Sequence, residues 1–383
     1  MRDARRLVAV AACLSLLVVV TPAGATHGSP AEPDFHCQWS LLNLGHTANS
    51  CVDSGTRGAD IQAQEAWALA ATTGLQRPAV IGIMETGVDI THPDLADQLW
   101  VNPGEDGLDA NGVSKRHNGI DDDANGYVDD VHGWNFANNN NIFPSGQHGT
   151  FVSSIAAADG DNGIGMAGVA GLDGQAKLMM LIRPSGTQGH RYAEVFDYAR
   201  QNGADVVNAS HAAPESPVNH YLAAWTNTVT IDAAKRATEA GVVLVLAAAY
   251  GSSLAYQPDG WDAYDFPGVL RVHASNFQGT RATGQDVGRT RIEIAAPGTA
   301  VYGATPGGGY AFGGDPSDGA TSYSAPHVAG AVALIKSVYP NLHGHKAAQA
   351  IIEGADLDPS FTLANKAGGR LNAYKALVRA GQL

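Results

Sequence analysis

Apolar runs of strand length alternate with helical patterns along most of this 383-residue chain. Few polar residues interrupt the runs, which lie at 79–84, 177–182, 204–209, 242–247, 269–273 and 292–295. The helical patterns lie between or after them, at 192–202, 222–240, 324–338 and 345–353. Strands that are apolar on both sides occur in parallel sheets whose two faces are covered by helices. The sequence therefore predicts an α/β fold with one such sheet.

The first apolar run ends in an acid. In VIGIMETGVD, residues 80–89, Glu85 follows the run directly and precedes a Thr-Gly turn. A carboxylate at the end of a buried strand is costly unless it has a partner. Functional groups of parallel sheets gather beyond the carboxyl ends of strands. We therefore expect Glu85 to belong to a functional site.

Two later motifs rich in small residues carry a histidine and a serine. QHGTFVSSIAAA, 147–158, places His148 at the entrance of a helix, and GATSYSAPHVAGAVALI, 319–335, places Ser322 just before another. There the serine N–H and the helix dipole would face an oxyanion. Taken singly, Ser322 could be a helix N-cap, His148 a surface histidine, and Glu85 a buried acid with a basic partner. Together, hydroxyl, imidazole and carboxylate predict nucleophilic catalysis.

These motifs resemble those of the subtilisin-like serine peptidases, the subtilases of peptidase family S8. The resemblance extends from CQWSLLNLG (37–45) and GADIQAQEAW (58–67) to GRLNA (369–373). It implies a doubly wound, mostly parallel sheet in an α/β/α sandwich and a protein or peptide substrate. It also implies that Ser322 is the nucleophile, His148 the general base and Glu85 the acid that orients the base.

The chain departs from the family pattern at several positions that the resemblance marks as functional. The family acid is an aspartate, and Glu85 is longer by one methylene. In GVVLVLAAAYGSS, 241–253, Tyr250 stands at the position of the oxyanion-hole asparagine. Ser210, His211 and Ala212 stand where the family has a substrate-binding strand that begins with serine and continues into glycines. Added methyl groups there would narrow the pocket and favour small substrate side chains; the alternative is a core strand with an altered edge. We therefore expect reduced peptidase activity.

The segment 102–147 is rich in Gly, Asn and Asp and predicts a large excursion from the core. Within it, Asp121, Asp123, Asn125 and Asp129 have the spacing of the first ligands of a calcium loop, with Gly126 at the turn. His132 stands where such a loop has its bidentate glutamate. The pattern predicts structural calcium and no organic cofactor. A solvated acidic turn is the alternative.

The first 25 residues have the features of an export signal: basic residues, an apolar run and the small residues Ala23-Gly24-Ala25. Residues 26–60 would form an N-terminal extension with a Cys37–Cys51 disulfide, and residues 61–383 the peptidase domain. The net charge of −14 argues against nucleic acid or, after signal cleavage, a membrane as partner. We expect a secreted, extracellular monomer.

Two functions from different classes fit these observations. The first is a secreted serine endopeptidase with a Glu-His-Ser triad and reduced activity. The second is a catalytically inactive subtilase-fold protein that binds proteins or peptides. An esterase is disfavoured because the chain contains no Gly-x-Ser-x-Gly elbow.

Overall fold

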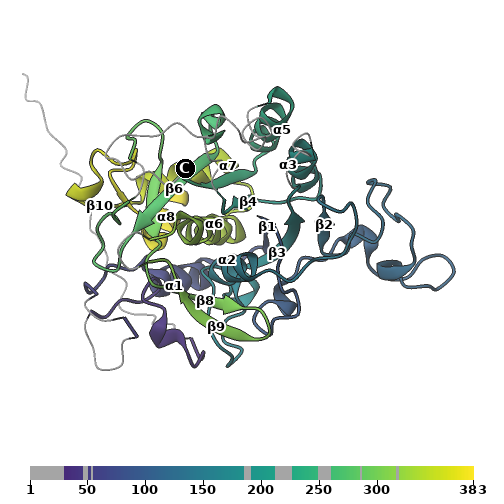
Figure 1. Ribbon diagram of the computed structural model, residues 1–383, viewed down its shortest axis with the longest axis horizontal. Coiled ribbons are helices and arrows are strands. Elements are labelled where there is room, and N and C mark those ends of the chain that lie inside the picture. Colours follow the sequence, from purple (N-terminus) through teal and green to yellow (C-terminus); the bar gives the residue numbers. More distant parts are fainter. Residues whose placement is uncertain are drawn as a thin grey trace, which may run out of the picture.

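The computed structural model describes residues 30–45, 51–52, 55–184, 191–211, 227–248, 260–284, 287–315 and 319–383. Within these residues a nine-stranded sheet forms the centre, in the order β10-β11-β7-β6-β5-β4-β1-β3-β2 (Figure 1). All neighbouring strands of this sheet are parallel except β10 and β11. Its strands are β1 (Ala79–Glu85), β2 (Gly133–Asn135), β3 (Ala176–Ile182), β4 (Val206–Ala209), β5 (Val243–Ala247), β6 (Val269–Ser275), β7 (Ile294–Pro297), β10 (Asp356–Leu357) and β11 (Gly369–Arg370).

Helices cover both faces of the sheet. Those on one face are α1 (Ala63–Thr73), α2 (Gln147–Ala157), α6 (Thr321–Val338), α7 (Gly344–Glu353) and α8 (Ala373–Ala380). Those on the other are α3 (Tyr192–Gln201) and α5 (Thr228–Glu239). Each face of the sheet has its own hydrophobic core. Strand β1 contributes Ile81 and Ile83 to the core beneath α6 and Met84 to the core beneath α3 and α5, because successive side chains point to opposite faces. The predicted α/β/α sandwich is confirmed.

The central helix of the first layer is α6. From Ser324 to Val338 all of its residues are buried, and an apolar helix of this kind belongs in the interior. Small residues allow it to lie close to its neighbours: a Cβ on Gly330 would come within 2.6 Å of Val169 Cβ. The helix begins at Thr321, three residues before the predicted start.

The N-terminal segment lies on the domain and is fastened to it by buried hydrogen bonds. The Gln38 side chain donates to Ala167 O at 2.7 Å and accepts from Ala167 N at 2.9 Å. The Trp39 indole N–H donates to Thr299 O at 3.0 Å. Cys37 is bonded to Cys51 in the structure.

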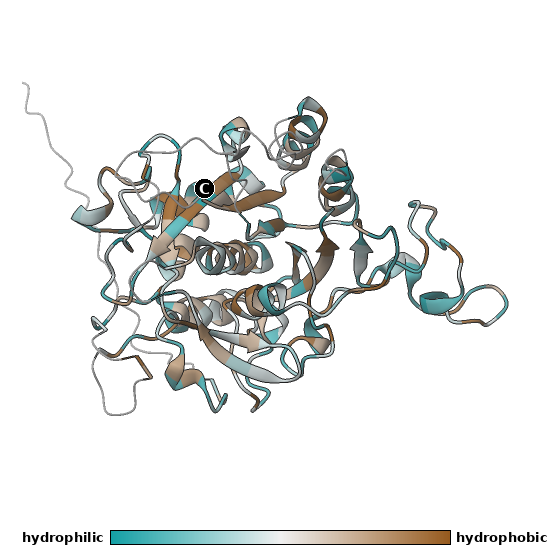
Figure 2. Cartoon of the chain, viewed as in Figure 1, coloured by the Kyte–Doolittle hydropathy of each residue, from teal (hydrophilic) through white to brown (hydrophobic). Residues whose placement is uncertain are grey.

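The predicted excursion leaves the domain beside the sheet edge and projects from it (Figure 1). It contains one short strand that the sequence did not indicate, β2, which pairs with β3. Hydrophilic residues dominate the projecting part, in contrast to the hydrophobic strands of the centre (Figure 2). A separate hairpin, β8 (Val301–Thr305) and β9 (Gly309–Gly313), packs on α2. None of the helices in the described residues is both long and apolar enough to cross a bilayer.

Candidate active site

The direction of chain progression across the sheet reverses at β1. After β1 the chain forms β2 and β3 on one side of it, and then β4 through β7 on the other. Such a switch point leaves a crevice at the carboxyl ends of the strands, where ligands bind in open α/β sheets. Glu85 is the last residue of β1, Arg183 follows β3, and Ser210 follows β4. These three residues therefore share one edge of the sheet.

Glu85 and His148 form the central contact of this edge. His148 Nδ1 lies 3.1 Å from Glu85 Oε2, which also accepts from Thr86 N at 3.3 Å. The Glu85 residue is only 2% exposed. Helix α2 can bring His148 this close because Gly149 has no side chain: a Cβ there would overlap Gly87 O and lie 3.0 Å from Glu85 Cβ. The longer acid thus reaches the histidine in this backbone.

The environment of His148 shifts its pKa in opposing directions. Burial disfavours the charged imidazolium, but the hydrogen bond to Glu85 and the negative charge of Glu85 outweigh it. The positive charge of Arg183 acts with burial. The pKa of His148 is raised above its usual 6.5 as a result. An imidazole with this partner is a stronger base than a free one.

Ser322 is the second residue of α6, within its first turn rather than just before the helix as expected. Its backbone N–H still lies at the positive end of the helix, since the first four N–H groups have no partner inside a helix. Ala320 stands at an extended φ of −141°, so its methyl group causes no strain there. The left-handed conformation of this turn falls on the preceding residue, Gly319, at φ +68°.

The residue after Ser322 contacts the histidine. The Tyr323 ring lies 5.8 Å from the His148 ring and 4.4 Å from Phe151, measured between centroids. Helices α2 and α6 are packed against each other, and each carries its candidate residue at the second position. The structure thus brings Glu85 and His148 into direct contact and places Ser322 on the neighbouring helix start.

Ser210 supports the backbone of Ser322. Pro326 has no N–H to donate to Ser322 O, the acceptor one helical turn earlier. The Ser210 hydroxyl donates to that carbonyl at 2.7 Å instead, and it accepts from the Asn208 side chain at 2.8 Å. Ser210, which the resemblance places in the substrate-binding strand, therefore links the end of β4 to the candidate nucleophile.

Replacing Ser210 by alanine is expected to lower the free energy of unfolding by about 1–3 kcal/mol, because two polar groups lose their partner. Chemical denaturation measures this change, and the rate of Ser322 labelling by a fluorophosphonate should also fall. Ser114 offers a matched control, because it is exposed and its side chain makes no cap hydrogen bond, so Ser114→Ala should alter stability by no more than about 0.5 kcal/mol. Equal stability of the two variants would contradict a supporting role for Ser210.

The other predicted substrate-binding and oxyanion positions are only partly described. His211 lies beside Trp261, with 5.8 Å between ring centroids. Burial and the positive charges of Arg183 and His148 hold the pKa of His211 well below 6.5, so this imidazole is neutral at neutral pH. Ala212 and Tyr250 lie outside the described residues.

The expected metal ligands separate into two groups. Asp121 accepts from the backbone N–H groups of Asn125 and Gly126, and Asp129 accepts from Gly119 N. These two carboxylates organise the loop.

Asp123 instead joins Glu105 and Asp130, two acids that the sequence pattern did not indicate, and Asn125 lies beside them. Burial raises the pKa of Glu105 to about 7, and the neighbouring carboxylates add to this rise.

Sequence reasoning also missed Arg183 and Tyr323. Arg183 could have been found from its place after the apolar run 177–182, since carboxyl ends of parallel strands share an edge. Tyr323 is adjacent to Ser322 in the motif TSYS, but no sequence signal places its ring against His148.

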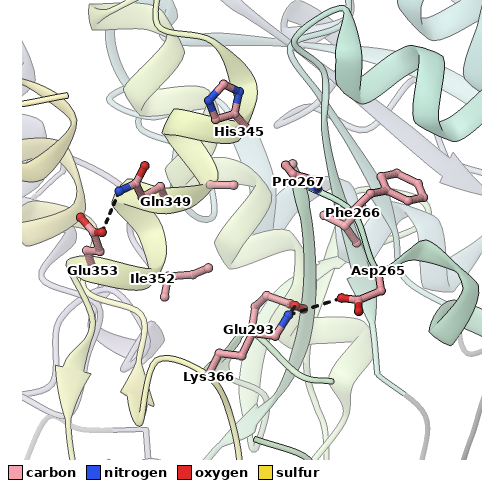
Figure 3. A pocket seen from close by; sticks show the side chains of 12 residues that line it. Asp265, Phe266, Pro267, Glu293, His345, Gln349, Ile352, Glu353 and Lys366 are labelled. Atoms are coloured by element: carbon pink, nitrogen blue, oxygen red, sulfur yellow. Dashed lines mark hydrogen bonds and ion pairs between the residues drawn. The ribbon is translucent and has the colours of Figure 1, made fainter. Parts of the chain in front are cut away.

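A surface pocket of about 440 Å³ lies away from this edge, beside α7 (Figure 3). Its charged groups are already paired: Lys366 binds Glu293 at 2.7 Å, and Gln349 donates to Glu353 at 2.8 Å. None of Glu85, His148 and Ser322 lines it. The pocket therefore takes no part in the candidate active site.

Serine hydrolases use an acid, a histidine and a serine. Here the acid ends a strand, and the histidine and serine stand at the starts of two neighbouring helices. The sequence model of the subtilase family matches residues 76–374, and the chain belongs to this family.

Among its relatives, thermitase of Thermoactinomyces vulgaris is 28% identical over 326 residues, covering 83% of this chain and 93% of thermitase. The thermophilic serine proteinase of Bacillus sp. (strain AK1) is 29% identical over 351 residues, covering 91% of this chain and 72% of that protein. Subtilisin-like protease 1 of Plasmodium vivax is 27% identical, and the chain spans 46% of its length.

The fold is shared with a solved protease structure from Pseudoalteromonas arctica PAMC 21717, with a TM-score of 0.61. That alignment covers 92% of this chain and all of the other, at 23% identity.

Proposed function

We propose that this protein is a secreted serine endopeptidase of reduced activity that uses Glu85, His148 and Ser322. Ser322 Oγ attacks the peptide carbonyl while His148 accepts its proton and later passes it to the leaving amine. Glu85 stabilises the imidazolium that forms. The Ser322 N–H contributes one donor to the oxyanion. The observation that carries this proposal is the 3.1 Å contact between the buried Glu85 carboxylate and His148 Nδ1.

The alternative is an inactive protein that uses the same fold to bind proteins or peptides. Tyr250 favours this alternative, because the resemblance places it where an oxyanion donor belongs and loss of such a donor costs about 10²–10³ in kcat. The intact acid–histidine contact favours the peptidase. Membership of the subtilase family is compatible with both.

A fluorophosphonate probe tests the peptidase proposal directly. The secreted, folded protein should be labelled, and Ser322→Ala should not be. Casein or peptide hydrolysis should exceed the Ser322→Ala background. Absence of both labelling and hydrolysis in protein that unfolds cooperatively would exclude the peptidase and leave the binding function.

Several further properties belong to the same proposal. The substrate would be a protein or peptide, with small side chains favoured near Ser210 and His211. Residues 61–383 would form the peptidase domain behind a cleaved signal of 25 residues. The mature protein would be an extracellular monomer that holds structural calcium but no organic cofactor.

A further inference from the structure

We propose that Arg183 is a specificity-determining residue that binds an acidic side chain of the substrate near the scissile bond. The proposal rests on the peptidase function proposed above, since it names the kind of substrate that this site prefers. Strand β3 pairs with β1 in parallel, and its last residue, Ile182, lies opposite Glu85 (Figure 1). Arg183 N donates to Glu85 O at 2.8 Å. The backbone of Arg183 is therefore joined directly to that of the candidate acid.

The charge of Arg183 reaches two histidines of the candidate active site. It acts to lower the pKa of His148, near the start of α2, and that of His211, which follows Ser210 beyond the end of β4. By the resemblance, His148 is the general base and His211 lies in the substrate-binding strand. A cation within electrostatic range of both is in position to meet a side chain of a bound peptide.

Arg183 has no anionic partner within the protein as far as the structure describes it. The ion pairs among the described residues include none with this guanidinium. Its Nε is buried and has no hydrogen-bond partner there. The acid at the same edge, Glu85, contacts His148 instead, at 3.1 Å. A guanidinium with unused N–H donors and no counter-ion is well suited to bind a carboxylate.

Tyr192 holds this guanidinium in one orientation. Arg183 Nη1 donates to the Tyr192 hydroxyl at 3.2 Å, and that hydroxyl donates to Pro184 O at 2.9 Å. Tyr192 is buried at the start of α3, so the contact has a rigid base. A side chain that is fixed in advance loses little conformational entropy on binding. Arg183 is itself partly exposed, so a substrate carboxylate can approach it.

A purely structural role for Arg183 makes a different prediction. If the side chain only linked β3 to α3 through Tyr192, removing it would lower stability but would leave the choice of substrate unchanged. Substrate choice is therefore the readout that separates the two roles.

Short fluorogenic alanine peptides test the proposal on the full chain. Each is blocked at both ends, so that only a side chain supplies charge, and carries one glutamate or one glutamine at successive positions around the scissile bond. At the position that reaches Arg183, kcat/KM should be about tenfold higher for the glutamate peptide than for its glutamine twin, through a lower KM. Added salt should weaken this preference, because the cation is partly exposed.

The matched variants are Arg183→Gln and Arg236→Gln. Arg183→Gln should lose the preference for glutamate, and the ratio of the two peptides cancels any change that this variant makes at His148. Arg236→Gln removes an equal charge at the end of α5, where the chain enters β5 at the opposite edge of the sheet, and should keep the full preference. Arg183→Lys retains the charge and should keep part of it; this variant serves if Arg183→Gln fails to fold.

Binding to the Ser322→Ala protein separates this proposal from the peptidase proposal. Fluorescence anisotropy should show the same preference for the glutamate peptide without cleavage. Preferential binding that Arg183→Gln abolishes would support the role of Arg183 even if the parent cleaves neither peptide. Cleavage without preference at any position, a preference that survives in Arg183→Gln, or no difference in binding would overturn it.

Discussion

Replacing Glu85 by glutamine is expected to lower kcat by about 10⁴-fold, the loss that follows when the acid of a serine-histidine triad becomes an amide. Glutamine keeps the shape of the side chain but removes the charge that stabilises the imidazolium. Its amide can also donate to Nδ1 and so favour the wrong tautomer of His148. Steady-state hydrolysis and the rate of fluorophosphonate labelling both measure the loss.

The same substitution should move the pH profile. His148 must be neutral to accept a proton, so kcat/KM of the parent should rise with pH through a pKa above 6.5. In Glu85→Gln, burial and the charge of Arg183 remain, and both lower the pKa of His148. The acidic limb should therefore shift to lower pH even as the maximum rate falls.

Glu65→Gln, on the exposed side of α1, is the control and should change neither the rate nor the profile. A Glu85→Gln enzyme with parental kcat and an unmoved acidic limb would show that Glu85 does not act on His148. A fall in rate without a shift in the limb would point to a structural role alone.

The fold could be predicted because its signals are local and repeated. Nearly continuous apolar runs between helical patterns identified the parallel sheet, and the strand ending at Glu85 was located to within one residue. The first residues of helices are harder to predict from the sequence. The first turn of α6 is TSYS, whose small and polar residues also suit a turn, so its start was predicted three residues late.

The candidate site could be predicted only where a motif carries it. Glu85, His148 and Ser322 each stand in such a motif. The contact of Ser210 with Ser322 O follows from a simple rule, since Pro326 must leave that carbonyl free, but the identity of the donor depends on tertiary packing. Glu105 lies far outside the spacing of a calcium loop. Only the path of the excursion brings it to Asp123.

The substitution expected to raise activity most is Tyr250→Asn, with a gain in kcat of about 10²–10³-fold, the usual worth of an oxyanion-hole donor. The resemblance assigns this donor position to Tyr250. Asparagine would supply a short amide donor in place of a rigid ring whose hydroxyl lies much farther from the backbone. The gain should appear in kcat, because the oxyanion forms only as the reaction proceeds.

Tyr250→Phe is the matched control, since it keeps the ring and removes the hydroxyl. If Tyr250 only occupies the pocket, Tyr250→Phe should have the parental kcat. A lower kcat in Tyr250→Phe would mean that the hydroxyl already acts as the donor, and the gain from Tyr250→Asn should then be small.

Glu85→Asp should raise kcat less than Tyr250→Asn does, although it also restores the family residue. The longer side chain already reaches His148 at 3.1 Å and already raises the pKa of that imidazole. Removing a methylene withdraws the carboxylate by about 1.5 Å, and a displacement near 1 Å can cost about 100-fold in a site that depends on alignment. We therefore expect Tyr250 to limit the rate more than Glu85 does, and a larger gain in kcat from Glu85→Asp than from Tyr250→Asn would reverse that order.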